Sequence, residues 1–340
     1  MCIGEPAEYG QWTSPVQAPG FPATELIASW NADTPPGTWL RVSARTRTST
    51  GAVTPWYVLA EWAHGDTDIR RTTIPGQDDE HAAVDVDTLT VEPGVRLHAY
   101  QLRVSLLRVA GSQVTPVLRA VGALASALPD RFTVPVSAPG RARGIELPVP
   151  RFAQNVHRGN YPEYGGGGES WCSPASTAMV LAYWGRGPDA AELAWLPPGY
   201  PDRPVAHAAR CTYDHAYHGT GNWPFNTAYA AHYGLRGRVT RLRSLTELED
   251  YLADGVPVIT SQSFLASELD GAGYDTAGHL LVVTGCTEDG DVIVNDPAAD
   301  DVRRVYPRAQ FETIWQRTRR HTADGTVAGG PGGIAYLIEP

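Results

Sequence analysis

The chain has 340 residues, of which 42% are apolar, so it is long enough for two domains with packed cores. Its formal net charge is −10, and all 27 basic residues are arginine because the sequence contains no lysine. The negative charge argues against a nucleic-acid partner, and the absence of lysine excludes a catalytic or phosphate-binding lysine.

The four cysteines are too sparse for a disulfide framework in a chain of this size. The first residues show no basic and apolar run of the secretory type, and no stretch is long and apolar enough to span a bilayer. Taken as given, the sequence therefore predicts a cytoplasmic protein, whereas a signal peptide encoded upstream would make it a secreted one. The cysteines are Cys2, Cys172, Cys211 and Cys286, the last in an apolar stretch where burial is expected.

Residues 1–128 are predicted to form an all-β sandwich of jelly-roll type. Within residues 38–48, Leu40, Val42 and Ala44 alternate with polar side chains, which is the pattern of a strand with one buried face. Many short strands without a convincing helix favour a sandwich. The other predicted strands are residues 56–62, 95–109 and 114–124.

Aromatic residues are frequent in this region. Exposed rings on a sandwich can stack on sugars, so contact with a polysaccharide through this domain is one hypothesis. Packing also favours aromatic side chains in sheets, and we interpret most of these residues as core. The residues concerned are Trp30, Trp39, Trp56, Tyr57 and Trp62.

Residues 129–144 are rich in proline and glycine and are predicted to be a linker. Residues 145–340 then mix helical and strand patterns, which indicates an α+β domain. Residues 195–203 read as a loop, and residues 219–234 as a loop that enters a helix capped by one of two asparagines, Asn222 or Asn226. A capping box, residues 244–247, predicts a further helix that ends by Gly255, followed by a strand at residues 256–260.

A cysteine lies on the first turn of a predicted helix, residues 172–184. Pro174 just inside the start and Gly185 just past the end are the expected boundary residues. The free N–H groups and positive dipole at a helix N-terminus favour the thiolate over the thiol. Cys172 is therefore a candidate nucleophile, although a lone cysteine at such a position is more often structural.

About a hundred residues later, two β-branched runs joined by Asp289-Gly290 predict a β-hairpin. His279 opens the first strand and Asp296 closes the second, so the carboxylate can approach the imidazole. A cysteine, a histidine and an aspartate in this arrangement can work as nucleophile, general acid–base and orienting carboxylate. Asn295 is an alternative to Asp296 as the orienting group.

An oxyanion donor is still needed. Gln154, upstream of the cysteine, is a plausible candidate, because its side-chain amide and the Cys172 backbone N–H could face a developing oxyanion together.

These blocks resemble the papain-like cysteine peptidases, specifically the standalone bacterial relatives of the double-glycine leader peptidases that process bacteriocins, peptidase family thirty-nine. That family uses a Gln, a Cys at a helix start, a His that opens a strand and an Asp before Pro. The resemblance covers residues 145–340 and implies the catalytic residues Gln154, Cys172, His279 and Asp296. It also implies a papain-like fold, a peptide substrate and no cofactor.

The chain departs from the family pattern in one respect. The stretch between Gln154 and Cys172 is longer than in papain-like enzymes and contains four consecutive glycines, residues 165–168. We interpret these glycines as a flexible approach to the active site, because no lysine follows to make a phosphate loop.

Two other groups of residues suggest sites but are interpreted as loops or turns. Cys211, Asp214, His215 and His218 are close enough in sequence to suggest a metal site, yet their segment reads as loop, where the helical spacing of a metal-ligand pair does not apply. Asp300 and Asp301 are expected to lie in a solvated turn.

Three functions are compatible with this pattern. The favoured one is a hydrolase that cleaves a peptide or amide bond through a Cys172 thioester. The second is an acyltransferase that uses the same residues but passes the acyl group to an amine. The third is a non-enzymatic, surface-binding protein in which the N-terminal domain binds polysaccharide and the peptidase-like domain is vestigial; against it, none of the four expected catalytic positions is substituted.

Overall fold

The computed structural model describes residues 7–67 and 69–340, so Cys2 lies outside the described part. The chain forms two compact units. The first consists of the residues up to 127 together with residues 211–232, and the second of residues 128–210 and 233–340. Within the described residues, no helix combines the length and apolarity needed to cross a membrane.

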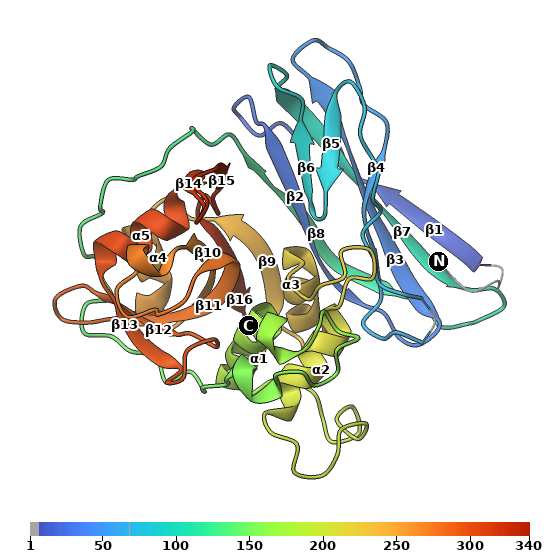
Figure 1. The fold of residues 1–340 in the computed structure, drawn as a ribbon. Coiled ribbons are helices and arrows are strands. Elements are labelled where there is room, and N and C mark those ends of the chain that lie inside the picture. Colours follow the sequence, from blue (N-terminus) through green and yellow to red (C-terminus); the bar gives the residue numbers. More distant parts are fainter. Residues whose placement is uncertain (1–6, 68) are drawn as a thin grey trace. The chain divides into compact units, whose positions relative to one another are not determined.

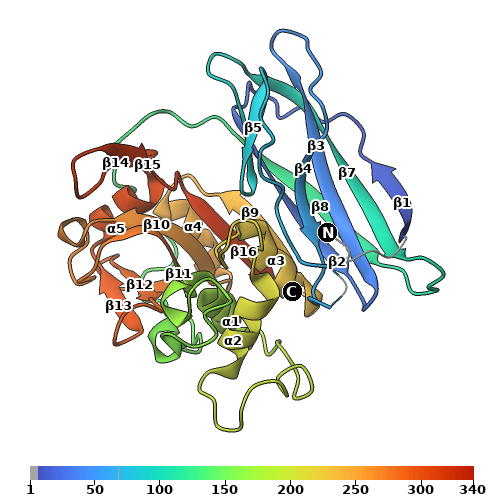
Figure 2. The ribbon, with the colours of Figure 1, turned by 45° about the vertical axis from the view of Figure 1, so that its right-hand side comes forward.

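The first unit contains two four-stranded antiparallel sheets (Figures 1 and 2). One has the order β1 (Ala7–Thr13), β7 (Leu97–Val109), β3 (Thr38–Thr48), β4 (Tyr57–Trp62). The other has the order β5 (Ala82–Asp85), β6 (Thr88–Val91), β2 (Glu25–Asp33), β8 (Val117–Ser126). The sheets pack together through apolar side chains, and the rings of Trp30 on β2 and Trp62 on β4 are 6.2 Å apart.

The strand pattern of this unit agrees with the alternation in the sequence. Leu40, Val42 and Ala44 are fully buried, while Arg41 on the other face of β3 is exposed.

The jelly-roll topology is wrong, however. The β3–β4 and β5–β6 hairpins each stay within one sheet, whereas the strands of a jelly roll pair in a different order. Alternation in the sequence determines which face of a strand is buried but not which strand becomes its neighbour.

The aromatic residues of this unit lie mostly in its core. Trp30, Trp39, Tyr57 and Trp62 are at most 4% exposed. Trp56 is half-buried, and the guanidinium carbon of Arg103 lies 3.8 Å from its ring centroid. Of the five aromatic residues proposed to stack on sugars, four are therefore covered by protein.

Helix α3 (Trp223–His232) belongs to this first unit and packs on β2. The side chain of Asn222 accepts a hydrogen bond from Phe225 N over 3.0 Å, so Asn222 is the cap. Asn226 instead donates to backbone carbonyls. Asp87 accepts a second bond, of 2.9 Å, from Trp223 N. The helix is fixed to the sandwich at its N-terminus by these contacts.

The second unit is built on a six-stranded antiparallel sheet (Figure 1). Its order is β13 (Arg303–Tyr306), β12 (Val292–Asn295), β11 (Thr276–Cys286), β10 (Val258–Phe264), β16 (Ile334–Glu339), β9 (Arg236–Arg241). The helices are α1 (Cys172–Tyr183), α2 (Arg203–Thr212, which runs into the first unit), α4 (Leu245–Ala253) and α5 (Arg308–Gln316). Short elements complete it: η1 (Gln154–His157), η2 (Gly168–Ser170), η3 (Ala266–Glu268), β14 (Arg319–His321) and β15 (Val327–Gly329). Helices α2 and α5 were not predicted.

The sheet is covered by helices on both faces. Apolar side chains of α4 and α5 form a buried core with alternate residues of β10, β11, β12 and β16. On the opposite face lies α1, where Ser176 donates a 3.1 Å hydrogen bond to the carbonyl of Leu280 on β11. The hydroxyl groups of Ser173 and Tyr336 on β16 are 3.0 Å apart. The helix that begins at the cysteine is thus fixed to two strands of the sheet, β11 and β16.

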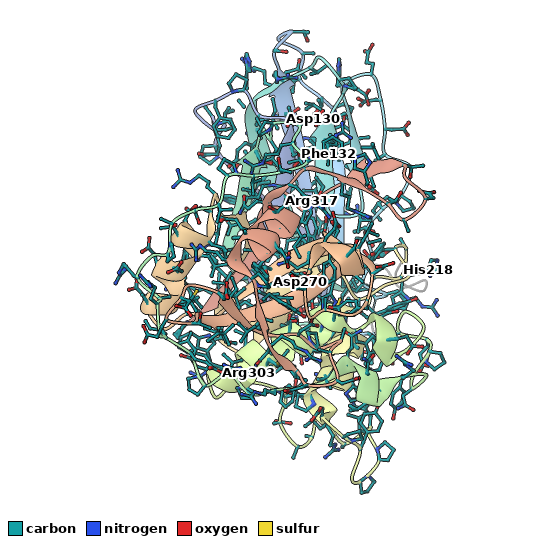
Figure 3. The ribbon with its side chains drawn as sticks, turned by 60° about the vertical axis from the view of Figure 1, so that its left-hand side comes forward. Asp130, Phe132, His218, Asp270, Arg303 and Arg317 are labelled. Carbon is teal, nitrogen blue, oxygen red and sulfur yellow. The ribbon has the colours of Figure 1, made fainter. Side chains whose placement is uncertain are left out.

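Residues 129–144, the expected linker, lie along the second unit. Asp130 forms a 3.0 Å ion pair with Arg319, and Phe132 stacks on the ring of His321 at 4.9 Å. Asp130 and Phe132 are labelled in Figure 3. Further along, Gly140 N donates a 2.7 Å hydrogen bond to Glu249 on α4. This proline-rich stretch is therefore held by polar contacts along its length.

Candidate active site

The candidate nucleophile lies where its sequence predicts. Cys172 is the first residue of α1 and is half-buried. Burial raises the pKa of its thiol, but the hydrogen bond and charge of His279 lower it, as do hydrogen bonds from the backbone of Leu280 and Ser173. The net result is a Cys172 pKa below its ordinary value, so the thiolate is stabilised.

The histidine lies between the cysteine and the aspartate. His279 Nε2 is 2.8 Å from Asp296 Oδ1, and both side chains are almost completely buried. Because Nε2 is used by the carboxylate, Nδ1 is the ring nitrogen left for the Cys172 sulfur. Burial disfavours the imidazolium, yet the charge and hydrogen bond of Asp296, together with the cysteine, raise the pKa of His279 above its usual range.

Two tyrosines that sequence reasoning missed complete the environment of Asp296. Tyr274 and Tyr306 each donate a 2.7 Å hydrogen bond to Oδ2, while Ala298 N donates a 3.0 Å bond to Oδ1. Burial acts to raise the pKa of Asp296, but the charge of His279 and these hydroxyl groups hold it below its ordinary range. The carboxylate is therefore kept ionised and fixed in orientation.

The structure distinguishes Asp296 from its neighbour Asn295. The Asn295 amide donates to the carbonyls of Val149 and Pro150, at 3.1 and 3.2 Å. This side chain holds the segment that leads into η1, and Asp296 is the residue that contacts His279.

Gln154 is also brought to this region. Its backbone N–H donates a 2.9 Å bond to the carbonyl of Pro297, directly after Asp296. Its side-chain Nε2 donates a 2.7 Å bond to the carbonyl of Glu169, three residues before Cys172. The structure thus bonds Gln154 both to the residue after Asp296 and to the segment before Cys172, in spite of the long stretch between Gln154 and Cys172.

Two family models match the chain. A family model described as Peptidase_C39 like matches residues 146–323, more than half of the chain. The chain belongs to the peptidase C39-like family. A second model, described as the peptidase C39 N-terminal domain, matches residues 5–126. The family expected from the sequence is thereby confirmed, and the family indicates a peptidase.

A solved structure from Bacillus anthracis, described as a candidate C39-like peptidase, is similar to part of the chain. It shares 18% sequence identity and has a TM-score of 0.33, covering 58% of this chain and 97% of that one. No curated protein matches the chain.

Other candidate residues of this C39-like protein are held by structural hydrogen bonds, buried in the core or exposed in a turn. Both carboxylate oxygens of Asp214 accept hydrogen bonds, from Thr73 and Asn222 among others, so it is a structural residue rather than an open metal ligand. Cys286 is 1% exposed, and burial raises the pKa of its thiol to about 12. Asp300 and Asp301 are exposed in a turn, as expected.

Proposed function

We propose that this C39-like protein is a cysteine-type peptidase or amidase. The observation that carries the proposal is the hydrogen-bonded series from Cys172 through His279 to Asp296. The lowered pKa of the cysteine and the raised pKa of the histidine favour a thiolate beside an imidazolium.

In the acylation step the Cys172 sulfur attacks the carbonyl carbon of the substrate. A carbon–sulfur bond forms and the carbonyl electrons move onto oxygen. When the tetrahedral intermediate collapses, the carbon–nitrogen bond breaks and the leaving amine takes the proton from Nδ1 of His279. The product is a thioester on Cys172 and a neutral imidazole.

In the second step the neutral His279 accepts a proton from water, and the resulting oxygen nucleophile attacks the thioester. The carboxylic acid product is released, and the proton taken from water stays on His279. Cys172 is then again a thiolate beside an imidazolium. Asp296 keeps Nε2 engaged throughout, which leaves Nδ1 directed at the reacting atoms.

Gln154 and the backbone N–H of Cys172 are assigned as the hydrogen-bond donors that stabilise the oxyanion of the substrate. One proton of Gln154 Nε2 is used by Glu169, and the amide carries a second. A side-chain amide in this role typically contributes a factor of roughly 10²–10³ to kcat.

The test is hydrolysis of a peptide library by the wild type and by Cys172→Ala. Loss of all cleavage in the variant, with an unchanged thermal unfolding transition, supports the proposal. Cleavage that persists in Cys172→Ala contradicts it. Repeating the assay with added amine distinguishes hydrolysis from acyl transfer, since only an acyltransferase yields the amide at low amine concentration.

A further inference from the structure

The stretch between Gln154 and Cys172 closes on itself at a narrow contact of η1 with η2. A Cβ atom at Gly168 would lie 2.4 Å from His157 Cβ and 2.5 Å from the carbonyl oxygen of Gln154. Only glycine allows this approach. The carboxylate of Glu169 accepts a 2.9 Å hydrogen bond from Gly159 N, which closes the same loop from the other side.

His157 occupies the centre of this contact. Its side chain is fully buried, and its ring lies 5.5 Å from that of Trp171, the residue before the nucleophile. Nδ1 is 3.0 Å from the hydroxyl of Tyr200, whose ring stacks on the imidazole at 5.3 Å. The ring thus connects η1 with the residue that precedes Cys172.

Gln154 and His157 are three residues apart in a 3₁₀ helix, so their side chains share one face. Both are buried. A displacement of His157 therefore moves the turn that carries Gln154. Burial lowers the pKa of His157 to about 4, so the ring is neutral at ordinary pH and acts through packing and its hydrogen bond.

We infer that His157 is a positioning residue for the oxyanion donor, and that Gly168 permits the contact through which it acts. The inference rests on the proposed function, because it assigns Gln154 to the oxyanion. His157 sets the position of Gln154 relative to Cys172 and leaves the thiolate unchanged, since its contacts are with Tyr200, Trp171 and Gly168 rather than with His279.

The experiment compares two reactions of Cys172 in the full chain. Acylation by 4-nitrophenyl acetate passes through an oxyanion, whereas alkylation by iodoacetamide does not, so the first reports on Gln154 and the second on the thiolate. The variants are Gln154→Ala, His157→Ala, His157→Phe, Gly168→Ala and the double variant Gln154→Ala/His157→Ala. His321→Ala is the matched control, because His321 also stacks on an aromatic ring but outside the active site.

We expect Gln154→Ala and His157→Ala each to slow acylation by about tenfold or more, with alkylation within about twofold of the wild type. The double variant should be about as slow as the slower single variant, because both substitutions remove the contribution of the same oxyanion donor, the Gln154 amide. Gly168→Ala should show the same selective loss, while His157→Phe should keep most of the acylation rate because its ring can still pack on Trp171. His321→Ala should change neither rate.

The inference is overturned if His157→Ala acylates at the wild-type rate, if it slows both reactions equally, or if the losses multiply in the double variant. A wild-type Cys172 inert to both reagents would overturn the proposed function as well. Reactivity with both reagents in the wild type, without the selective loss in His157→Ala, would overturn this inference alone.

Discussion

The Tyr274 hydroxyl donates a 2.7 Å hydrogen bond to Oδ2 of Asp296. Its ring also meets the imidazole of His279 edge-on, with centroids 5.6 Å apart and planes at 79°. Tyr274 therefore contacts two members of the proposed catalytic set. With Tyr306 on Oδ2, it leaves Oδ1 for His279.

Replacing Tyr274 with Phe should raise the pKa of Asp296, because a hydrogen bond to the charged carboxylate is lost. Hydrogen bonds to charged groups contribute about 1.5–3 kcal/mol, so turnover should fall by roughly tenfold or more. The loss should be largest at acidic pH, where the carboxylate now protonates more readily. The measurement is kcat/KM against pH.

Tyr183→Phe is the control for that variant. Its hydroxyl donates a 2.9 Å bond to the carbonyl of Gly255, away from the carboxylate. A pH profile that shifts equally in the two tyrosine variants would contradict a specific role for Tyr274.

Replacing Asp296 with Asn should lower the pKa of His279, because the carboxylate is the largest influence that raises it. The alkaline limb of the activity profile, where the imidazolium loses its proton, should then move to lower pH. The profile is measured by initial rates across the pH range. An alkaline limb at the wild-type pH would show that Asp296 does not hold the proton on His279.

Asn295→Ala should behave differently from Asp296→Asn. It removes two hydrogen bonds to the carbonyls of Val149 and Pro150, which should cost about 1–3 kcal/mol of unfolding free energy. Because Asn295 does not contact His279, the alkaline limb should stay in place. Chemical denaturation and the pH profile together test this pair.

The buried ion pair of Glu249 and Arg308 should contribute to the stability of the fold without affecting the reactivity of Cys172. The two groups are 2.6 Å apart, and Glu249 also accepts bonds from Gly140 N and Ala142 N. Glu249→Gln leaves the Arg308 charge buried without its partner, which typically costs about 3–5 kcal/mol. Denaturation should show this loss, while the alkylation rate of Cys172 below the transition should equal the wild-type rate.

The sequence predicted the local features of the site well. Helix α1 begins at Cys172, and β11 and β12 form the hairpin that carries His279 and ends beside Asp296. These features follow from residues that are neighbours in the chain: a proline at a helix start, alternating apolar residues, and an Asp-Gly turn.

Long-range pairings could not be predicted in the same way. Tyr274 and Tyr306 lie 22 and 10 residues from Asp296 in the chain, and their hydroxyl groups both reach its Oδ2 only in the folded domain. The jelly-roll prediction failed for the same reason. The assignment of α3 to the first unit also depends on distant partners, Asp87 and the residues of β2.

In the proposed mechanism, Cys172 is activated by His279. The most direct measurement is the rate of iodoacetamide alkylation of Cys172 against pH, in the wild type and in His279→Ala, with mass spectrometry of the labelled peptide. We expect a thiolate that forms well below the free-cysteine pKa of about 8.5, and the loss of that shift in the variant. An ordinary or unreactive thiol that is indifferent to His279 would contradict it.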